Sequence, residues 1–406
     1  MAHNPPLYQQ SSAMEPLLPV ASREKLQALS CDIWRLAGSL SASIPSLINR
    51  QRIALLVREM NSYYSNLIEG HKTLPRDIER ALRADYSAAP EKRANQHLNR
   101  AHIEVEALMT GRLQSEPDLT IHSEEFLCWL HREFYSRLPD ELHYSENRAG
   151  KRYRILPGQL RDFEVQVGQH LPPHFAALPK FLHRFARFYG QESVLPADRL
   201  VAAAAAHHRL AWIHPFGDGN GRVARLHSHA ALIRCQADGL GLWTISRGLA
   251  RQRQQYYEQL SLADQKRWND YDGRGNLSDK ALGDFCVFFL QIVRDQIEFM
   301  TGLLQLERLW TRMERHLHLE ALHLDRRTIE RLARLLKAAL IEGEIERGRV
   351  REIIGQGDTT ARTLIRTALQ EGLMDSASPK GPLSLVFDAK TLENYFPQLY
   401  QDLPTG

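Results

Sequence analysis

The chain lacks several features that would place it in a specialised class. Only four cysteines occur in 406 residues, and Cys31, Cys128, Cys235 and Cys286 form no CxxC pair. Each lies among apolar neighbours, so we expect buried free thiols in a reducing compartment and neither disulfides nor a zinc site. No apolar run approaches the length of a membrane span, and the polar, proline-broken start is unlike a secretory signal. We therefore expect a cytoplasmic protein without membrane contact.

The sequence also has little excess charge. Its net charge is +4, with 43% apolar, 25% charged and 8% aromatic residues. These values are typical of a globular protein, and they permit contact with phosphates or nucleic acid without requiring it. A length of 406 residues exceeds what one hydrophobic core usually organises, so we expect two or three domains. We find no internal repeat and no low-complexity tract.

The spacing of apolar residues predicts a mainly α fold. We expect a flexible arm at residues 1–20, an N-terminal helical region at 21–120 and a helical core at 121–310. Between Gly150 and Pro173 the helical period disappears, and β-prone residues with Gly and Pro predict a short β-hairpin flap.

The last part of the chain has a different pattern. Two helical runs, residues 326–341 and 347–354, lead into a turn and a third run, with Asp358 expected as the N-cap of the third helix. Two short β-prone segments then flank ASPKGP. This order predicts a winged helix-turn-helix domain at 323–406, with Arg362 and Arg366 on one face of its third helix.

One loop concentrates the chemistry of the chain. Residues 213–222 read IHPFGDGNGR and lie between an alanine-rich helical run and an apolar-periodic run. If one helix ends near Ile213 and the next begins near Asn220, the loop lies at a helix N-terminus. There, unpaired N–H groups and the helix dipole favour an anion, and the glycines let the backbone approach it closely. The loop therefore predicts a phosphate site.

The side chains in and after this loop fit phosphate chemistry. His214 exchanges a proton near neutral pH, and Asp218 is a hard oxygen ligand suited to Mg²⁺ shared with phosphates. Arg222 and Arg225 lie in the first turn of the next helix, where cations are unfavourable unless something negative compensates them. Phe216 has no polar role and is expected to anchor the loop in the core.

These residues resemble the signature of the Fic family, H-x-F-x-[D/E]-G-N-G-R-x-x-R, without a departure. The resemblance implies a Fic-like helical core that transfers AMP from ATP to a Ser, Thr or Tyr hydroxyl of a target protein, using ATP and Mg²⁺. It implies that His214 is the base and that Asp218 holds the metal. The phosphate-binding residues it implies are Gly217, Gly219, Asn220, Gly221, Arg222 and Arg225.

A second segment resembles the inhibitory motif of the same family, [S/T]-x-x-x-E-[G/N]. Ser65, Glu69 and Gly70 match it at the end of a helix expected at about 45–70. Ser65 and Glu69 share one helical face, and Gly70 suits a C-cap. The resemblance implies that Glu69 pairs with Arg225 and so removes the partner of the γ-phosphate, which would make the enzyme autoinhibited.

Two further segments resemble the family less closely. Val165, Gln166, Val167 and Gly168 resemble the flap strand that holds the target by β-augmentation, although the usual doubled glycine is missing. Tyr256 and Tyr257 lie in the region that covers adenine, where an aromatic ring could stack on the base. An ordinary surface hairpin and a helix at a core boundary are the alternatives.

Other functions stay open at this point. The same loop could remove AMP or transfer another nucleotide or phosphate group, or the chain could be mainly a DNA-binding regulator that acts through its winged helix. That domain could also contact protein, because winged helices serve both purposes. The sequence leaves the target protein and a homodimer undetermined.

Overall fold

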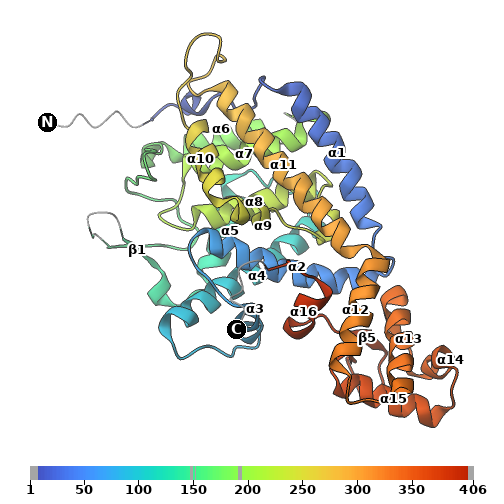
Figure 1. The fold of residues 1–406 in the computed structure, drawn as a ribbon. Coiled ribbons are helices and arrows are strands. Elements are labelled where there is room, and N and C mark those ends of the chain that lie inside the picture. Colours follow the sequence, from blue (N-terminus) through green and yellow to red (C-terminus); the bar gives the residue numbers. More distant parts are fainter. Residues whose placement is uncertain (1–7, 147–149, 151, 191–193, 401–406) are drawn as a thin grey trace. The chain divides into compact units, whose positions relative to one another are not determined.

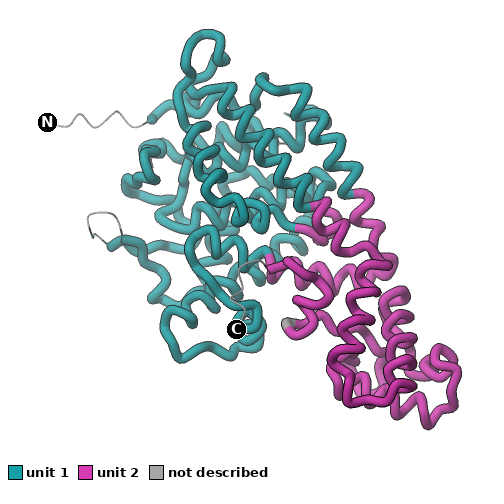
Figure 2. The backbone as a smooth tube through the Cα atoms, in the orientation of Figure 1, with its two compact units in different colours: residues 1–37, 61–238, 244–296 teal, residues 38–60, 239–243, 297–406 magenta. Residues whose placement is uncertain are grey.

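The computed structural model describes residues 8–146, 150, 152–190 and 194–400. The chain forms two compact units (Figure 2). Unit 1 comprises residues 1–37, 61–238 and 244–296, and unit 2 comprises residues 38–60, 239–243 and 297–406. The boundary falls within three helices, α1 (Arg23–Ser41), α2 (Leu47–Ile68) and α11 (Asp279–Leu304). The fold is mainly helical, which confirms the predicted fold class.

Unit 1 is built around α7 (Arg199–Ile213), which packs against α6 (Leu178–Tyr189) and α8 (Asn220–Arg234) (Figure 1). Nearly every side chain of α7 is buried. Its alanine run makes this possible, because small side chains let neighbouring helices approach closely. The other helices of this unit are α3 (Pro75–Leu82), α4 (Pro90–Ser115), α5 (Glu124–Tyr135), α9 (Ile245–Arg251) and α10 (Arg253–Ala263), with 3₁₀ turns η1 (Ser11–Met14), η2 (Asp140–Leu142), η3 (Phe175–Ala177) and η5 (Pro196–Asp198).

The expected flexible arm is wrong for residues 8–20. Met14 is fully buried and Leu17 nearly so. Arg209, itself buried, donates from Nε and Nη2 to the Pro16 carbonyl at 3.0 and 2.8 Å. The polar composition of this segment predicted a solvated tail. Instead, its few apolar side chains are buried in unit 1, and the Pro16 carbonyl accepts from the buried Arg209. Residues 1–7 lie outside the described residues.

The predicted hairpin exists, but it begins earlier in the chain. β1 (Tyr144–Glu146) pairs antiparallel with β2 (Arg152–Arg154). Residues 165–168, expected as the flap strand, belong to no strand, and only Val167 forms an isolated bridge, to His170. The expected placement followed β-prone residues, whereas strand pairing depends on which segments lie side by side.

Unit 2 contains α12 (Leu306–Glu320), α13 (Arg326–Glu342), α14 (Val350–Ile354), α15 (Asp358–Gln370) and α16 (Ala389–Tyr395), with 3₁₀ turns η6 (Gly239–Gly241) and η7 (Arg347–Arg349). A three-stranded antiparallel sheet has the order β3 (Glu344–Ile345), β5 (Leu383–Leu385), β4 (Met374–Asp375). From α13 onward the order is helix, strand, helix, helix, strand, strand. The three helices and the last two strands occur in the expected order, β3 was not expected, and the winged helix-turn-helix stays a prediction. Asn49 of α2 donates to the Ala339 and Leu340 carbonyls and so caps the end of α13.

Asp358 is not the N-cap but the first residue of α15, and Gly357 takes the cap position. Of the four free cysteines, Cys286 is buried, Cys128 and Cys235 are partly buried, and Cys31 is exposed, against expectation, because it lies on the outer face of α1. Among the described residues, no helix combines the length and apolarity that crossing a membrane requires.

Candidate active site

The loop between α7 and α8 ends one helix and begins the next at the predicted positions. His214 terminates α7 in the left-handed region, with φ 51° and ψ 61°. This conformation is uncommon for a residue with a Cβ and is concentrated at functional sites. Gly219 precedes α8, also left-handed at φ 76°. The first intrahelical bond of α8 joins the Val223 N–H to the Gly219 carbonyl, so the N–H groups of residues 220–222 come before it and point out of the helix end.

Two glycines of the loop, Gly219 and Gly221, lie close to side chains from other helices. A Cβ on Gly219 would lie 2.8 Å from the Tyr135 ring, and Gly219 also has a left-handed φ of 76°, so a side chain there is disfavoured twice. A Cβ on Gly221 would meet Oε1 of Glu69, so a side chain there would displace the Glu69 carboxylate.

The Asn220 side chain holds the loop in shape. Its Nδ2 donates to the Phe216 carbonyl at 2.8 Å, and its Oδ1 accepts from the Phe216 N–H at 2.9 Å. Phe216 is fully buried and stacks on His131, with ring centroids 4.1 Å apart. Phe216 therefore has the anchoring position expected for it, whereas the polar atoms of Asn220 serve the loop itself and leave anion contacts to the backbone N–H groups.

His214 is held by an arginine from the preceding segment. Arg161 Nε donates to the His214 carbonyl at 2.9 Å, and the Arg161 N–H donates to the Pro215 carbonyl at 2.9 Å. Burial, together with the charges of Arg161 and His170, lowers the pKa of His214 to about 4. The imidazole is therefore neutral at physiological pH, as a general base must be.

The Asp218 carboxylate is oriented by two donors on the same oxygen. Tyr135 donates to Oδ2 at 2.7 Å, and Arg222 Nη2 reaches Oδ2 at 3.4 Å. Burial raises the pKa of Asp218, but Arg222 and the Tyr135 hydroxyl outweigh this effect and hold the pKa below its usual value. The side chain is 43% exposed, so an ionised carboxylate faces the opening of the site.

Arg222 is a buried cation with unpaired donors. Its guanidinium lies 5.0 Å from the centre of the Phe134 ring, and the residue is only 6% exposed. Nε and Nη1 have no hydrogen-bond partner among the described residues. Buried donors without partners cost about 1–3 kcal/mol each, and a bound water, ion or ligand is one way in which native proteins satisfy them.

Arg225, in contrast, has partners at the end of α2. Its side chain is 2% exposed, and Nη2 donates to Oε1 of Glu69 at 2.7 Å. Nε donates to the Ser65 hydroxyl and Nη2 to the Ser65 carbonyl, both at 2.9 Å. Burial raises the pKa of Glu69, but attraction to Arg225 and Arg222 lowers it below the usual value. Gly70 follows at φ 92°, as expected for the residue that ends this helix.

A buried network lies behind Arg225. The His207 ring bonds to the Ser228 hydroxyl through Nδ1 and to the Tyr256 hydroxyl through Nε2, both at 2.7 Å. Tyr256 is 3% exposed, whereas Tyr257 is 42% exposed and donates to the Ile68 carbonyl at 3.2 Å. Of the two tyrosines considered for adenine, only Tyr257 therefore offers ring surface.

The sequence reasoning missed three residues of the site, namely Tyr135, Arg161 and His131. His131 and Tyr135 are four residues apart on α5, a spacing that places them on one helical face, and this was the only available signal. Nothing in the sequence indicated a role for Arg161, because an arginine in an irregular segment is ordinarily a solvated side chain.

The fold and the site together define a class of protein. It is a helical domain in which one interhelical loop and the helix that follows it bring together backbone N–H groups, a neutral histidine, a carboxylate and a buried arginine. The model of the Fic/DOC family matches residues 120–232, so this segment, which includes the whole loop between α7 and α8, is similar to the domain of that family.

Curated relatives share this part of the chain. "Protein adenylyltransferase Fic" of Drosophila mojavensis is 35% identical over 134 residues, which cover 33% of this chain and 26% of the relative. Its counterpart in Drosophila melanogaster is 37% identical over 111 residues, covering 27% and 21%. The chain thus matches about a quarter of the length of these relatives.

Solved structures share the fold. A Fic family protein from Desulfovibrio desulfuricans G20 has a TM-score of 0.53 at 17% identity, covering 91% of this chain and 98% of that one. Fic-1 from C. elegans has a TM-score of 0.51 at 18% identity, covering 70% and 73%. At these identities the likeness concerns the fold alone.

Proposed function

We propose that this protein is an adenylyltransferase that transfers AMP from ATP to a Ser, Thr or Tyr hydroxyl of a target protein. One observation carries the proposal. Arg222 is buried with two unpaired donors beside a helix N-terminus whose first N–H groups point outward. Such a cradle fits the phosphates of a nucleotide, because phosphate oxygens satisfy both sets of donors and the charge of Arg222.

The residues fit a magnesium ion at Asp218. Tyr135 and Arg222 both contact Oδ2 of this carboxylate, and the side chain is 43% exposed, so the carboxylate stays accessible to a metal. Mg²⁺ in nucleotide sites is commonly bound by one or two carboxylates together with substrate phosphates and waters. When bound, it would neutralise charge on the phosphates during transfer.

We assign the role of the base to His214. In the proposed step, the target hydroxyl oxygen forms a bond to the α-phosphorus of ATP, and the bond from that phosphorus to the bridging oxygen breaks. Pyrophosphate leaves, and the hydroxyl proton passes to the neutral imidazole of His214. General base catalysis of this kind contributes about 10²–10⁴ in rate, and Arg161 fixes the backbone that carries the ring.

We further propose that Glu69 keeps the enzyme inactive. The support is that Arg225, the arginine that would hold the γ-phosphate, donates to both Glu69 and Ser65. The Glu69 carboxylate also lies directly over Gly221 of the phosphate loop. Productive binding of ATP would then require Arg225 to be released.

The test is ATP labelled at either the α- or the γ-phosphate, with incorporation into the protein itself as readout. It is run in a Glu69→Gly background, with His214→Ala as the test variant and exposed His183→Ala on α6 as its matched control. Transfer from the α-position alone, lost in His214→Ala and kept in His183→Ala, supports the proposal. Transfer from the γ-position alone would establish phosphorylation, and no transfer from either position would overturn the proposal.

A further inference from the structure

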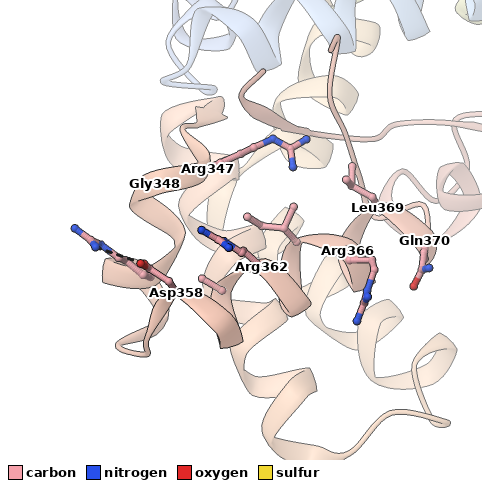
Figure 3. Close-up of a pocket in the computed structure, with 10 residues that line it drawn as sticks. Arg347, Gly348, Asp358, Arg362, Arg366, Leu369 and Gln370 are labelled. Carbon is pink, nitrogen blue, oxygen red and sulfur yellow. Dashed lines mark hydrogen bonds and ion pairs between the residues drawn. The ribbon is translucent and has the colours of Figure 1, made fainter. Parts of the chain in front are cut away.

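Unit 2 carries a basic groove that the proposed activity does not use. The groove has a volume of about 800 Å³. It lies between the segment of η7 and α14 and the helix α15 (Figure 3). Its lining includes four arginines and one carboxylate: Arg347, Arg351, Arg362, Arg366 and Asp358. Four cations against one anion in ten lining residues make this an electropositive surface, although the chain as a whole has a net charge of only +4.

Two of these arginines have no partner. Arg351 is 3.4 Å from Asp358, and Arg347 donates to the Gly381 carbonyl at 2.9 Å. Arg362 and Arg366 have neither an ion pair nor a hydrogen bond to any described residue, and both are exposed. They are four residues apart and so project from one face of α15. Two adjacent like charges without a counter-charge repel each other, and an anion bound between them would remove that cost.

The geometry of α15 separates a packing face from a free face. Ala361, Leu364, Ile365 and Ala368 are buried, and α13 and α14 pack on this helix. Thr359, Arg362, Thr363 and Arg366 are exposed. Figure 3 shows Arg362 and Arg366 on α15 with Arg347 and Gly348 on the opposite wall. The free face of α15 is thus a row of hydroxyl and guanidinium groups beside the groove.

A turn of the β-hairpin is tied to the same groove. The Arg347 bond to the Gly381 carbonyl holds the loop between β4 and β5 close to η7. This loop carries the exposed Lys380. The cations of η7, α15 and the hairpin loop therefore belong to one surface, formed by three separate elements.

We propose that this surface binds duplex DNA, with Arg362 and Arg366 on phosphates and the free face of α15 toward the major groove. A helix is about 10–12 Å across, which matches a B-DNA major groove of about 12 Å. The major groove of duplex RNA is too narrow for a helix. Arginine and threonine side chains contact phosphates and base edges. This binding is independent of nucleotide transfer in unit 1.

The test uses the full-length protein and fluorescence anisotropy with a labelled DNA duplex of about 24 base pairs, long enough for a helix-turn-helix footprint. The test variant is Arg362→Ala/Arg366→Ala. The matched control is Arg308→Ala/Arg315→Ala, which removes the same charge from exposed positions on α12. A third variant, Arg362→Lys/Arg366→Lys, retains the charges.

The expected result concerns the salt dependence. Loss of two phosphate contacts lowers the slope of log K against log salt by about 1.8, which between about 50 and 200 mM amounts to a roughly 12-fold smaller loss of binding. The control and the lysine variant should keep the wild-type slope. The proposal is overturned if the wild type does not bind the duplex, if the test variant keeps the wild-type slope, or if duplex RNA or a doubly phosphorylated peptide binds more tightly than DNA. Labelling of the protein from ATP is measured in the same variants, and its outcome tests the proposed nucleotide transfer and not the binding of DNA.

Discussion

The contact between Glu69 and Arg225 gives the sharpest prediction for the proposed regulation. Glu69→Gln removes the charge but keeps an acceptor, Glu69→Gly removes both, and Ser65→Ala removes only one acceptor of Arg225. In the structure the pair is a single charge-assisted bond of 2.7 Å, with Arg225 2% and Glu69 29% exposed. Glu69→Gln therefore tests the charge of residue 69, and Glu69→Gly also tests the presence of its side chain over Gly221. Ser65→Ala tests the bond from Arg225 to the Ser65 hydroxyl.

The magnitudes follow from these contacts. A hydrogen bond to a charged group contributes about 1.5–3 kcal/mol. Because the glutamate is partly exposed, we take the lower half of that range, about 1.5–2 kcal/mol, which corresponds to a roughly 12- to 27-fold shift. Glu69→Gln should raise the initial rate by about that factor, and Glu69→Gly should exceed it because the carboxylate over Gly221 is also removed. Ser65→Ala should give a smaller rise than either Glu69 variant, because the Ser65 carbonyl and Glu69 still accept from Arg225.

The assay is the initial rate of α-label incorporation at saturating ATP. Glu116→Gly is a matched control, because Glu116 also follows the end of a helix and pairs with an arginine, Arg112. Lowering the pH should not raise the labelling rate as the Glu69 variants do. The pKa of Glu69 is lowered, so the pair persists as pH falls and is lost only below the usual carboxylate range. Unchanged rates in both Glu69 variants, or a larger effect of Ser65→Ala, would refute the reasoning.

Three further predictions concern the loop and its support. Since the pKa of His214 is lowered to about 4, the acid limb of kcat/KM in the Glu69→Gly background should have its midpoint near that value; a midpoint at the ordinary histidine value of about 6.5 would contradict the burial argument. Asn220→Ala leaves the buried N–H and carbonyl of Phe216 without partners, so it should cost about 2–4 kcal/mol in urea unfolding and abolish labelling. Tyr256→Phe leaves His207 Nε2 unpaired in the core and should cost about 1–3 kcal/mol, and an unchanged unfolding midpoint would mean that water replaces the hydroxyl.

Much of the local structure could be predicted from the sequence. The helix starts at Asn220 and at Arg326, and the end of α7 at Ile213, agree with the structure. Apolar spacing, caps and glycines act over a few residues, and they operate in the same way in any fold. The hairpin was placed too late in the chain because β-prone residues do not reveal which segment lies beside them.

The sequence by itself determined that a glycine-rich loop lies between two helices and that it carries His214, Asp218 and two arginines, because these residues are neighbours in the chain. Only the tertiary structure decided what each of them faces. Glu69 meets Arg225 across 156 positions, and Tyr135 reaches Asp218 across 83. Residues 8–20 fill part of unit 1 instead of forming a free arm. Such contacts depend on how distant helices pack, and the chemistry of a single segment does not contain that information.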